Sequence, residues 1–357
     1  MTIKVSKPAI NIREELADLK QDTGLKGQEL MRADTMAELR GIIGTGRKNQ
    51  IINGDFAVSQ RGDYTSATSA VHTTFYLDRW CPNISTVTGT IQDTGFAVKL
   101  VATSSATGTL RLRQKLEEMS YLSGKTVTIS CQMKSNDANS RIGVYADGWQ
   151  STTATHTGGG AWETLSITLT LPSGVSSELS VHLGIDGASS ADVSITSGAY
   201  CEIKEAQMEL GKVATEFEHR SYGEELALCQ RYFYNIFHGA ASKVYFDLHQ
   251  YSASGNAGWS AFTVPYPVPM RASPTFIHSM TNAKCTGAAL TGGTDTWTYY
   301  MQNQGYANVQ GNGDASTYSG GGEDKGVIGT YYVSATHGLV SHIVIASGTT
   351  FQFDAEL

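Results

Sequence analysis

The sequence lacks the features of several protein classes. Its 357 residues contain no apolar run near the roughly 18–20 residues that a bilayer span needs. Its first residues, MTIKVSKPAINIREEL, lack the apolar core of a signal peptide. Its 26 Lys and Arg stand against 33 Asp and Glu, a net charge of −7, whereas a nucleic-acid binder normally carries a basic excess. We therefore expect neither membrane insertion nor a nucleic-acid partner.

Paired cysteines and catalytic motifs are also missing. The five cysteines lie far apart and form no CxxC motif, which favours buried thiols over a zinc site or a disulfide framework. The sequence has no HExxH, GxSxG or GxxxxGK[ST] motif. Its scattered carboxylates have no spacing that by itself specifies a glycosidase. We therefore predict no catalytic residues and no enzymatic activity.

The residues that are present are distributed unevenly. Residues 1–48 hold 16 of the 59 charged residues, whereas 223–357 hold 14 of them but 20 of the 33 aromatic residues. A weakly charged, aromatic-rich segment is too apolar to be disordered by composition, and this length favours more than one domain. We predict a mainly β chain in three parts: a short helical anchor at 1–48, a β-sandwich or jelly roll at 49–222, and a connector with a second β domain at 223–357.

The anchor has the pattern of two short helices. Asn11 with Glu14, and Thr35 with Glu38, have the spacing of capping boxes. The apolar residues that follow at helical spacing are Ile12, Leu16, Leu19, Leu39 and Ile42. Because two such stripes cannot form a core alone, we expect them to contact another molecule. A helical lid folded back on the next domain is the alternative.

The sandwich is predicted from alternation. Residues 126–131, 165–169 and 179–183 alternate apolar and polar side chains with period two and are rich in β-branched residues. Trp162, at the start of one such strand, is expected in the core. The adjacent Asp78 and Arg79 are expected to form an ion pair beside Trp80 in a structural corner. Residues 223–234 are predicted to form a helical connector.

Six segments in order carry a family resemblance. They are NQIINGDFAVSQRG (49–62), YLDRW (76–80), LRQKLE (112–117), LSGKTVTISCQMKSN (122–136), GAWETLSITLTLPSG (160–174) and EAQMELGKVATEFEHRSYGEELALCQRYFY (205–234). Together they resemble a module of bacteriophage tail fibres that looks like a carbohydrate-binding jelly roll. The N-terminal IREELADLKQDTGLKGQELMRADT is similar to the anchoring ends of short-tailed phage fibres.

The resemblance implies a virion tail fibre protein, made in the host cytoplasm, that attaches the particle to a host surface glycan or protein. It implies a homotrimer, which would cover the many strand edges of the C-terminal part, and an N-terminus that docks to phage tail or adaptor proteins. Jelly rolls of this kind often hold a structural calcium ion near the first and last strands. Asp55 and Glu205 are the candidate ligands, and no other cofactor is expected.

Receptor contact is predicted in the C-terminal loops. Strands are expected at 244–251, 259–270, 297–304, 327–335 and 339–346, with polar loops between them. Aromatic rings stack on sugars while amides and carboxylates bind hydroxyls, and loops place such groups on a surface. The candidates in the longest polar loop region are Tyr306, Asn308, Asn312, Asp314 and Tyr318. Two alternatives stay open: a capsid or tail structural fibre without receptor binding, and a glycan-degrading tail spike, although the chain lacks the internal repeat of a long β-helix.

Overall fold

The structure is a computed structural model that describes most of the sandwich region and parts of the C-terminal region. The described ranges are 48–117, 119–187, 191–236, 244–247, 249–254, 257–272, 274–278, 284–286, 298–301, 321–322, 325–333, 342–345 and 351–356. The predicted anchor helices and their apolar faces (Ile12, Leu16, Leu19, Leu39 and Ile42) lie outside these residues. In the described ranges, no helix has the length and apolar character needed to cross a membrane.

Two antiparallel sheets form a sandwich between residues 68 and 210. Its strands are β1 (Thr68–Ser69), β2 (Cys81–Ser85), β3 (Gly89–Asp93), β4 (Val98–Ala102), β5 (Ala106–Lys115), β6 (Thr126–Ser135), β7 (Ser140–Ala146), β8 (Trp149–Thr155), β9 (Trp162–Thr170), β10 (Leu179–Ile185), β11 (Val193–Ile195) and β12 (Tyr200–Leu210). A four-residue helix, α4 (Met119–Leu122), joins β5 to β6. The predicted β-sandwich is therefore confirmed.

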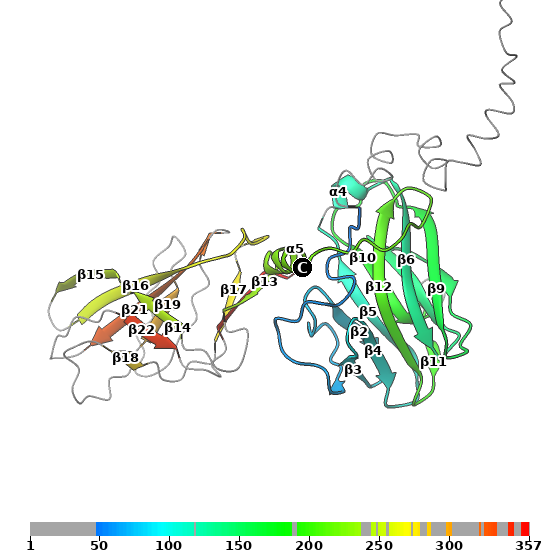
Figure 1. Cartoon of the computed structure of the whole chain (residues 1–357), viewed down its shortest axis with the longest axis horizontal. Helices are drawn as coiled ribbons and strands as arrows, with labels where there is room; N and C mark the ends of the chain where they lie inside the picture. The colour runs from blue at the N-terminus through cyan, green and yellow to red at the C-terminus, as the bar shows by residue number, and fades with distance from the viewer. Residues whose placement is uncertain are drawn as a thin grey trace, which may run out of the picture.

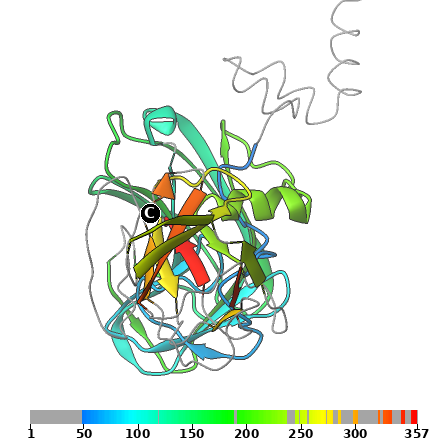
Figure 2. The same cartoon turned by 90° about the vertical axis from the view of Figure 1, so that its left-hand side faces the viewer.

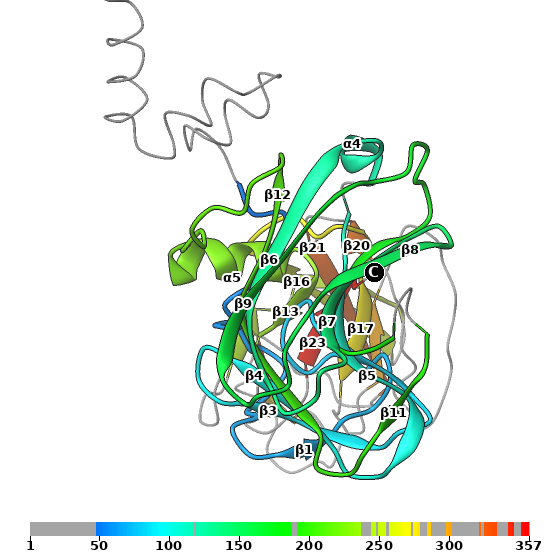
Figure 3. The ribbon, with the colours of Figure 1, turned by 90° about the vertical axis from the view of Figure 1, so that its right-hand side faces the viewer.

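The strand order identifies the sandwich as a jelly roll. One sheet, here the β12 sheet, has the order β1-β3-β4-β12-β6-β9, and the other, here the β10 sheet, has the order β11-β5-β10-β7-β8 with β2 added on β5. The chain crosses between the sheets from β4 to β5, β5 to β6, β6 to β7, β8 to β9, β9 to β10 and on to β12. This gives the two four-stranded layers of a jelly roll, β4-β12-β6-β9 and β5-β10-β7-β8. Figure 3 shows the two layers facing each other.

The core lies between these layers and follows the predicted alternation. Leu165 and Ile167 of β9 point inward with their neighbours on β6 and β10, and such side chains contribute about 1.5–3 kcal/mol each when fully buried. Trp80 and Phe56 pack against each other with ring centroids 5.3 Å apart. The prediction that Trp162 is in the core is wrong, because its side chain is on the other face of β9 and is 38% exposed.

A helix and a small sheet come after the sandwich. Helix α5 (Tyr222–Gln230) begins with a capping box between Ser221 and Glu224. Strand β13 (Phe233–Asn235) then pairs with β23 (Phe351–Asp354), which also pairs with β17 (Thr275–His278). The helix predicted for 223–234 is thus shorter, because the aromatic residues after it favour a strand. In Figures 1 and 2, α5 is the yellow-green helix at the side of the sandwich.

The remaining C-terminal strands form two further antiparallel sheets. One has the order β14-β22-β18 and the other β15-β16-β21-β19, with β20 paired to β21. Their bounds are β14 (Val244–Asp247), β15 (His249–Ser254), β16 (Ala257–Pro265), β18 (Lys284–Thr286), β19 (Thr298–Met301), β20 (Gly321–Gly322), β21 (Lys325–Val333) and β22 (His342–Ile345). Each of the five predicted strand segments overlaps one or more of these strands. Pro265 ends β16, as expected for a residue that cannot donate to a ladder.

Candidate functional site

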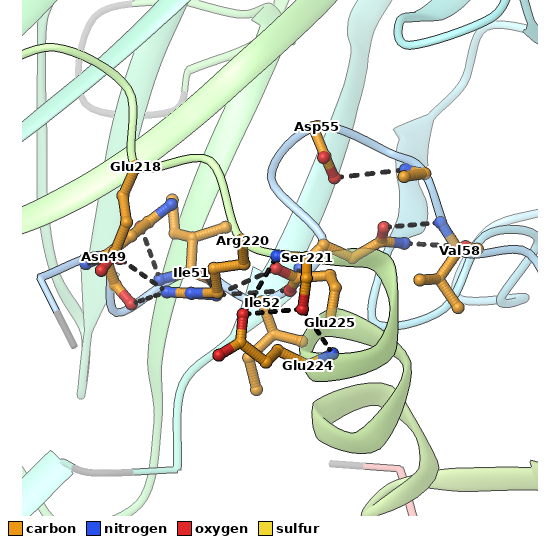
Figure 4. Close-up of polar contacts among 12 residues, drawn as sticks. Asn49, Ile51, Ile52, Asp55, Val58, Glu218, Arg220, Ser221, Glu224 and Glu225 are labelled. Carbon is orange, nitrogen blue, oxygen red and sulfur yellow. Dashed lines mark hydrogen bonds and ion pairs between the residues drawn. The ribbon is translucent and has the colours of Figure 1, made fainter.

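A buried arginine joins the start of the sandwich to the segment that leaves it (Figure 4). Arg220 donates to the main-chain oxygens of Asn49 and Ile51 and pairs with Glu218 at 3.1 Å and with Glu225 at 3.2 Å. Glu218 in turn accepts from the main-chain nitrogen of Asn49 at 2.7 Å. We call these five residues the Arg220 clamp. The clamp satisfies buried main-chain groups, so its role is structural.

The adjacent turn is also structural. Asn53 is buried with a φ of 57°, and its side chain donates to the carbonyls of Val58 and Asp78 at 2.8 and 3.0 Å. Its own carbonyl accepts from the Trp80 indole at 2.8 Å. Gly54 is required here, because a Cβ atom would lie 2.1 Å from the carbonyl oxygen of Ala206. The NGD motif therefore positions the chain rather than a ligand.

The two calcium candidates lie next to a shared main-chain hydrogen bond. The Ala206 nitrogen donates to the Gly54 oxygen at 2.8 Å, which brings Asp55 and Glu205 to adjoining segments. Asp55 accepts from the Ala57 nitrogen at 3.3 Å in a local turn (Figure 4). Two carboxylates fall short of the roughly six to eight oxygens that calcium takes. In the described part of the chain, no three His, Cys, Asp or Glu residues gather as a metal site would require. The calcium site stays a prediction.

Asp78 and Arg79 do not form the expected ion pair. The Asp78 carboxylate accepts from the main chain and the side chain of Gln60, at 2.6 and 3.2 Å, and burial raises its pKa to about 7. Arg79 instead pairs with Glu356, next to the last strand, and its guanidinium lies 3.6 Å from the ring centroid of Tyr232. Adjacent residues diverge because Arg79 has a φ of 71°. The corner is structural, but it ties the C-terminal strand to the sandwich.

The outer face of the β10 sheet gathers basic side chains. On β5 the outward residues are Arg111, Arg113 and Lys115, on β7 they are Arg141, Gly143 and Tyr145, and on β10 they are Ser180, His182 and Gly184. We call these nine residues the basic face. The register places His182 between Arg113 on one side and Gly143 on the other. The central strand thus carries short side chains, flanked by the longer ones of β5 and β7.

Two groups in the middle of the basic face lack hydrogen-bond partners. The Nε atom of Arg113 and the Nδ1 atom of His182 are both buried and unpaired, although the other imidazole nitrogen lies 3.2 Å from the Ser180 hydroxyl. Burial, together with Arg111 and Arg113, lowers the pKa of His182 well below its usual range. The imidazole is therefore neutral near pH 7. Unpaired buried polar groups are costly unless water or a ligand satisfies them.

The outer face of the β12 sheet is different, because three of its lysines contact aromatic or acidic side chains of the same sheet. The Lys204 ammonium lies 4.9 Å from the centroid of the Trp162 ring, and Lys99 lies 4.8 Å from that of Tyr200. Lys134 lies 3.9 Å from Glu202. Each of these three lysines thus has a partner from its own sheet.

A small cleft lies where α5 meets the sandwich. Its volume is about 130 Å³ and its lining includes Glu117, Arg231 and Tyr232. These three side chains bond to one another, because Glu117 accepts from Arg231 at 2.7 Å and from the Tyr232 hydroxyl at 2.6 Å. Small-molecule sites usually occupy roughly 300–1,000 Å³. The cleft is therefore a packing gap at a polar junction.

The structure describes none of the predicted receptor contacts. Tyr306, Asn308, Asn312, Asp314 and Tyr318 lie outside the described residues, and their role stays a prediction. The basic face was not predicted from the sequence. Its signal was present, because basic residues alternate with leucines in LRLRQK and a histidine alternates with apolar residues in LSVHLGI. The pairing of these two strands has no such signal in the sequence.

Comparison with known proteins found no matching protein family and no matching curated protein. Among solved structures, a CBM4 module is 15% identical and covers 44% of this chain and 98% of its own, with a TM-score of 0.26. The tandem CBM22 modules of Paenibacillus barcinonensis Xyn10C are 13% identical and cover 83% and 100%, with a TM-score of 0.28. The enzymatically active domain of tailspike protein 4 of bacteriophage CBA120 is 12% identical and covers 46% and 21%, with a TM-score of 0.27. Similarities this low do not establish a shared fold, so the jelly roll rests on the strand pairing of this chain.

Proposed function

We propose that this chain is a virion fibre protein whose jelly roll binds a glycan of the host cell surface. The observation that carries the proposal is the basic face, where the Arg113 guanidinium has no hydrogen bond to an oxygen and the His182 Nδ1 atom has no partner among the described residues. A sugar hydroxyl can both donate and accept a hydrogen bond, so it can pair with either group. The six sequence segments that resemble tail-fibre modules support the location in a virion.

The sheet suits this task because it is rigid. The strands β5, β10 and β7 are continuously paired, with Leu183 of β10 opposite Leu112 on one side and Ile142 on the other. Their inward residues are fixed in the core, so the outward residues keep their spacing when a ligand binds. Such preorganisation lowers the entropic cost of binding. Tyr145, at the margin of the face, adds a ring on which a sugar can pack.

The rest of the proposal concerns assembly. In a homotrimer, three weak glycan sites act together and their effective concentration raises the strength of attachment. Residues 1–48 would dock to the particle, and the C-terminal loops would add further receptor contacts. We propose that the chain binds without cleaving, needs no cofactor and is carried on the phage tail.

Binding of the full-length chain to immobilised bacterial surface polysaccharides, neutral and acidic, tests the function by biolayer interferometry. We expect binding to at least one polysaccharide, with a loss in Arg113→Gln and none in Lys134→Gln, the matched change on the β12 sheet. A reducing-end assay on the bound polysaccharide should show no product. Absence of binding to every member of the panel would refute glycan binding, and product release would favour the tail-spike alternative.

The fibre role has a separate test. Phage that encode a chain without residues 1–48 should produce particles that lack the protein, while the purified truncated chain should still bind the polysaccharide. Loss of both properties would refute the division of labour between the anchor and the sandwich.

A further inference from the structure

We propose that the basic face selects a sugar that carries a carboxylate, such as a uronic acid. This inference rests on the proposed glycan binding and adds the chemical class of the ligand. It starts from Arg113, whose guanidinium differs in its hydrogen-bond partners from those of the other arginines that the structure describes.

The other buried or partly buried arginines that the structure describes all donate to oxygen. They are Arg61, Arg79, Arg111, Arg141, Arg220, Arg231 and Arg271. The Arg113 guanidinium has one hydrogen-bond partner among the described residues, the Cys81 sulfur at 3.9 Å, and sulfur is a weak acceptor. Among the described arginines, Arg113 is therefore the one whose guanidinium has no hydrogen bond to an oxygen. Its side chain is 16% exposed, so a ligand can reach it.

A protein carboxylate marks the place that an anion would take. Glu178 lies 3.8 Å from the guanidinium of Arg113 and 3.8 Å from the ammonium of Lys115, too far for a hydrogen bond to either. The guanidinium fork binds a planar carboxylate through two parallel hydrogen bonds when the carboxylate is free to approach. The Glu178 carboxylate accepts instead from the Ser180 hydroxyl at 3.4 Å, and the Glu178 main-chain nitrogen donates to Asp147 at 2.7 Å.

Arg113 and Lys115 share a single carboxylate, although the chain as a whole is acidic. Arg111 pairs with Asp186, whereas Arg113 and Lys115 both face Glu178. The charged groups that act on the buried His182 beneath are Arg111 and Arg113. A neutral sugar would leave this excess uncompensated, whereas a carboxylate neutralises it.

His182 is a positioning residue in this arrangement. It lies directly opposite Arg113 in the strand register and is 5% exposed, with Gly143 as its other neighbour across the sheet. Its unpaired Nδ1 can bond a water or a sugar oxygen near the Arg113 guanidinium. Since Gly143 has no side chain, the ligand would rest against the sheet between Arg113 and Tyr145.

The test compares each acidic polymer with its neutral counterpart. Polygalacturonate, alginate and hyaluronate are each used intact and after chemical reduction of their carboxyl groups, with the full-length chain and calorimetric titration. We expect at least one intact polymer to bind about tenfold or more tightly than its reduced form, as loss of a charge-assisted bond implies. Arg113→Gln should remove most of this preference, and Lys134→Gln should keep it.

A second variant is expected to raise the affinity for the acidic polymer. Glu178→Gln removes the competing carboxylate, so it should bind the intact polymer several-fold more tightly and leave the reduced form unchanged. A merely structural role of Arg113 and Glu178 would not produce opposite shifts confined to the acidic ligand.

The outcomes separate this inference from the proposed function. If the chain binds intact and reduced polymers equally, glycan binding stands and the carboxylate preference is refuted. If the preference exists but Arg113→Gln and Glu178→Gln leave it unchanged, its assignment to the basic face is refuted. If the chain binds none of these six polymers and none of the neutral bacterial polysaccharides, the proposed function itself fails.

Discussion

Replacing Arg220 by methionine should destabilise the folded chain by about 3–5 kcal/mol, the usual cost of removing one partner from a buried ion pair. The side chains of Arg220 and Glu225 are 8% and 6% exposed, so water cannot replace the lost guanidinium. Methionine keeps much of the aliphatic volume, which limits the packing loss. The Glu225 carboxylate would keep the main-chain nitrogen of Asn53 as a donor but lose its cation. Burial already raises the pKa of Glu225 in the intact clamp.

A double-mutant cycle can separate the Arg220–Glu225 interaction from the other contributions to this loss of stability. Glu225→Gln retains an oxygen that accepts from Asn53 while removing the charge. The double variant Arg220→Met with Glu225→Gln should therefore lose less stability than the sum of the single variants, by about 1 kcal/mol or more. The assay is urea unfolding of the full-length chain, followed through the fluorescence of the buried Trp80. Lys212→Met, at an exposed lysine, is the control and should stay within about 0.5 kcal/mol of the unmutated chain.

Two results would contradict this reasoning. A loss below about 1 kcal/mol for Arg220→Met would mean that the clamp tolerates an unpaired carboxylate, against the expected cost of a buried charge. Additive single and double variants would mean that Arg220 and Glu225 do not interact energetically, despite their 3.2 Å separation.

Three further predictions concern buried groups. The pKa of Asp78 is raised from 3.8 to about 7, so between these pH values the folded chain binds a proton that the unfolded chain releases. The free energy of unfolding should therefore rise as the pH falls through this window, by at most about 1.4 kcal/mol per pH unit. Asp78→Asn should remove this pH dependence in urea titrations from pH 5 to 8. Gly54→Ala should cost about 1–3 kcal/mol or more, since its Cβ would lie 2.1 Å from the Ala206 oxygen, whereas Gly223→Ala in α5, which meets no atom within 4 Å, should leave the melting temperature unchanged or raised. Ellman's reagent should reach four buried thiols only after the chain unfolds: Cys81, Cys131, Cys201 and Cys229. Rapid labelling of any of these four thiols in the folded chain would contradict their burial.

The sequence was sufficient to predict the sandwich strands named below but not which strands pair with one another. Alternation predicted β6, β9 and β10 because each has one face in the core. The same alternation places Trp162 outward, because Leu165 and Ile167 at odd-numbered positions of β9 point inward. The prediction of a buried Trp162 was based on the size of its side chain and not on its position in the alternation. Size is a weaker guide, because a large aromatic side chain can also lie on a sheet surface beneath a lysine.

The candidate site was harder to predict, because it depends on pairing between distant segments. Arg113 and His182 are far apart in the chain and face each other only because β5 and β10 are neighbours in the jelly roll. The prediction of an Asp78–Arg79 ion pair was wrong because it relied on closeness in the sequence. The positive φ of Arg79 directs its side chain to Glu356, and no local sequence pattern connects these two residues.

The position of the Arg220 clamp has a mechanical consequence. A pull applied between residue 48 and helix α5 meets the clamp first, because Asn49 and Ile51 are bonded directly to the segment that leads into α5. The tension therefore passes through the hydrogen bonds and ion pairs of the clamp, and also through β12, because Asn49 and Gln50 are hydrogen-bonded to Met208. Since β12 belongs to the sheet opposite the basic face, a ligand bound on the basic face would lie on the sheet that does not carry these hydrogen bonds.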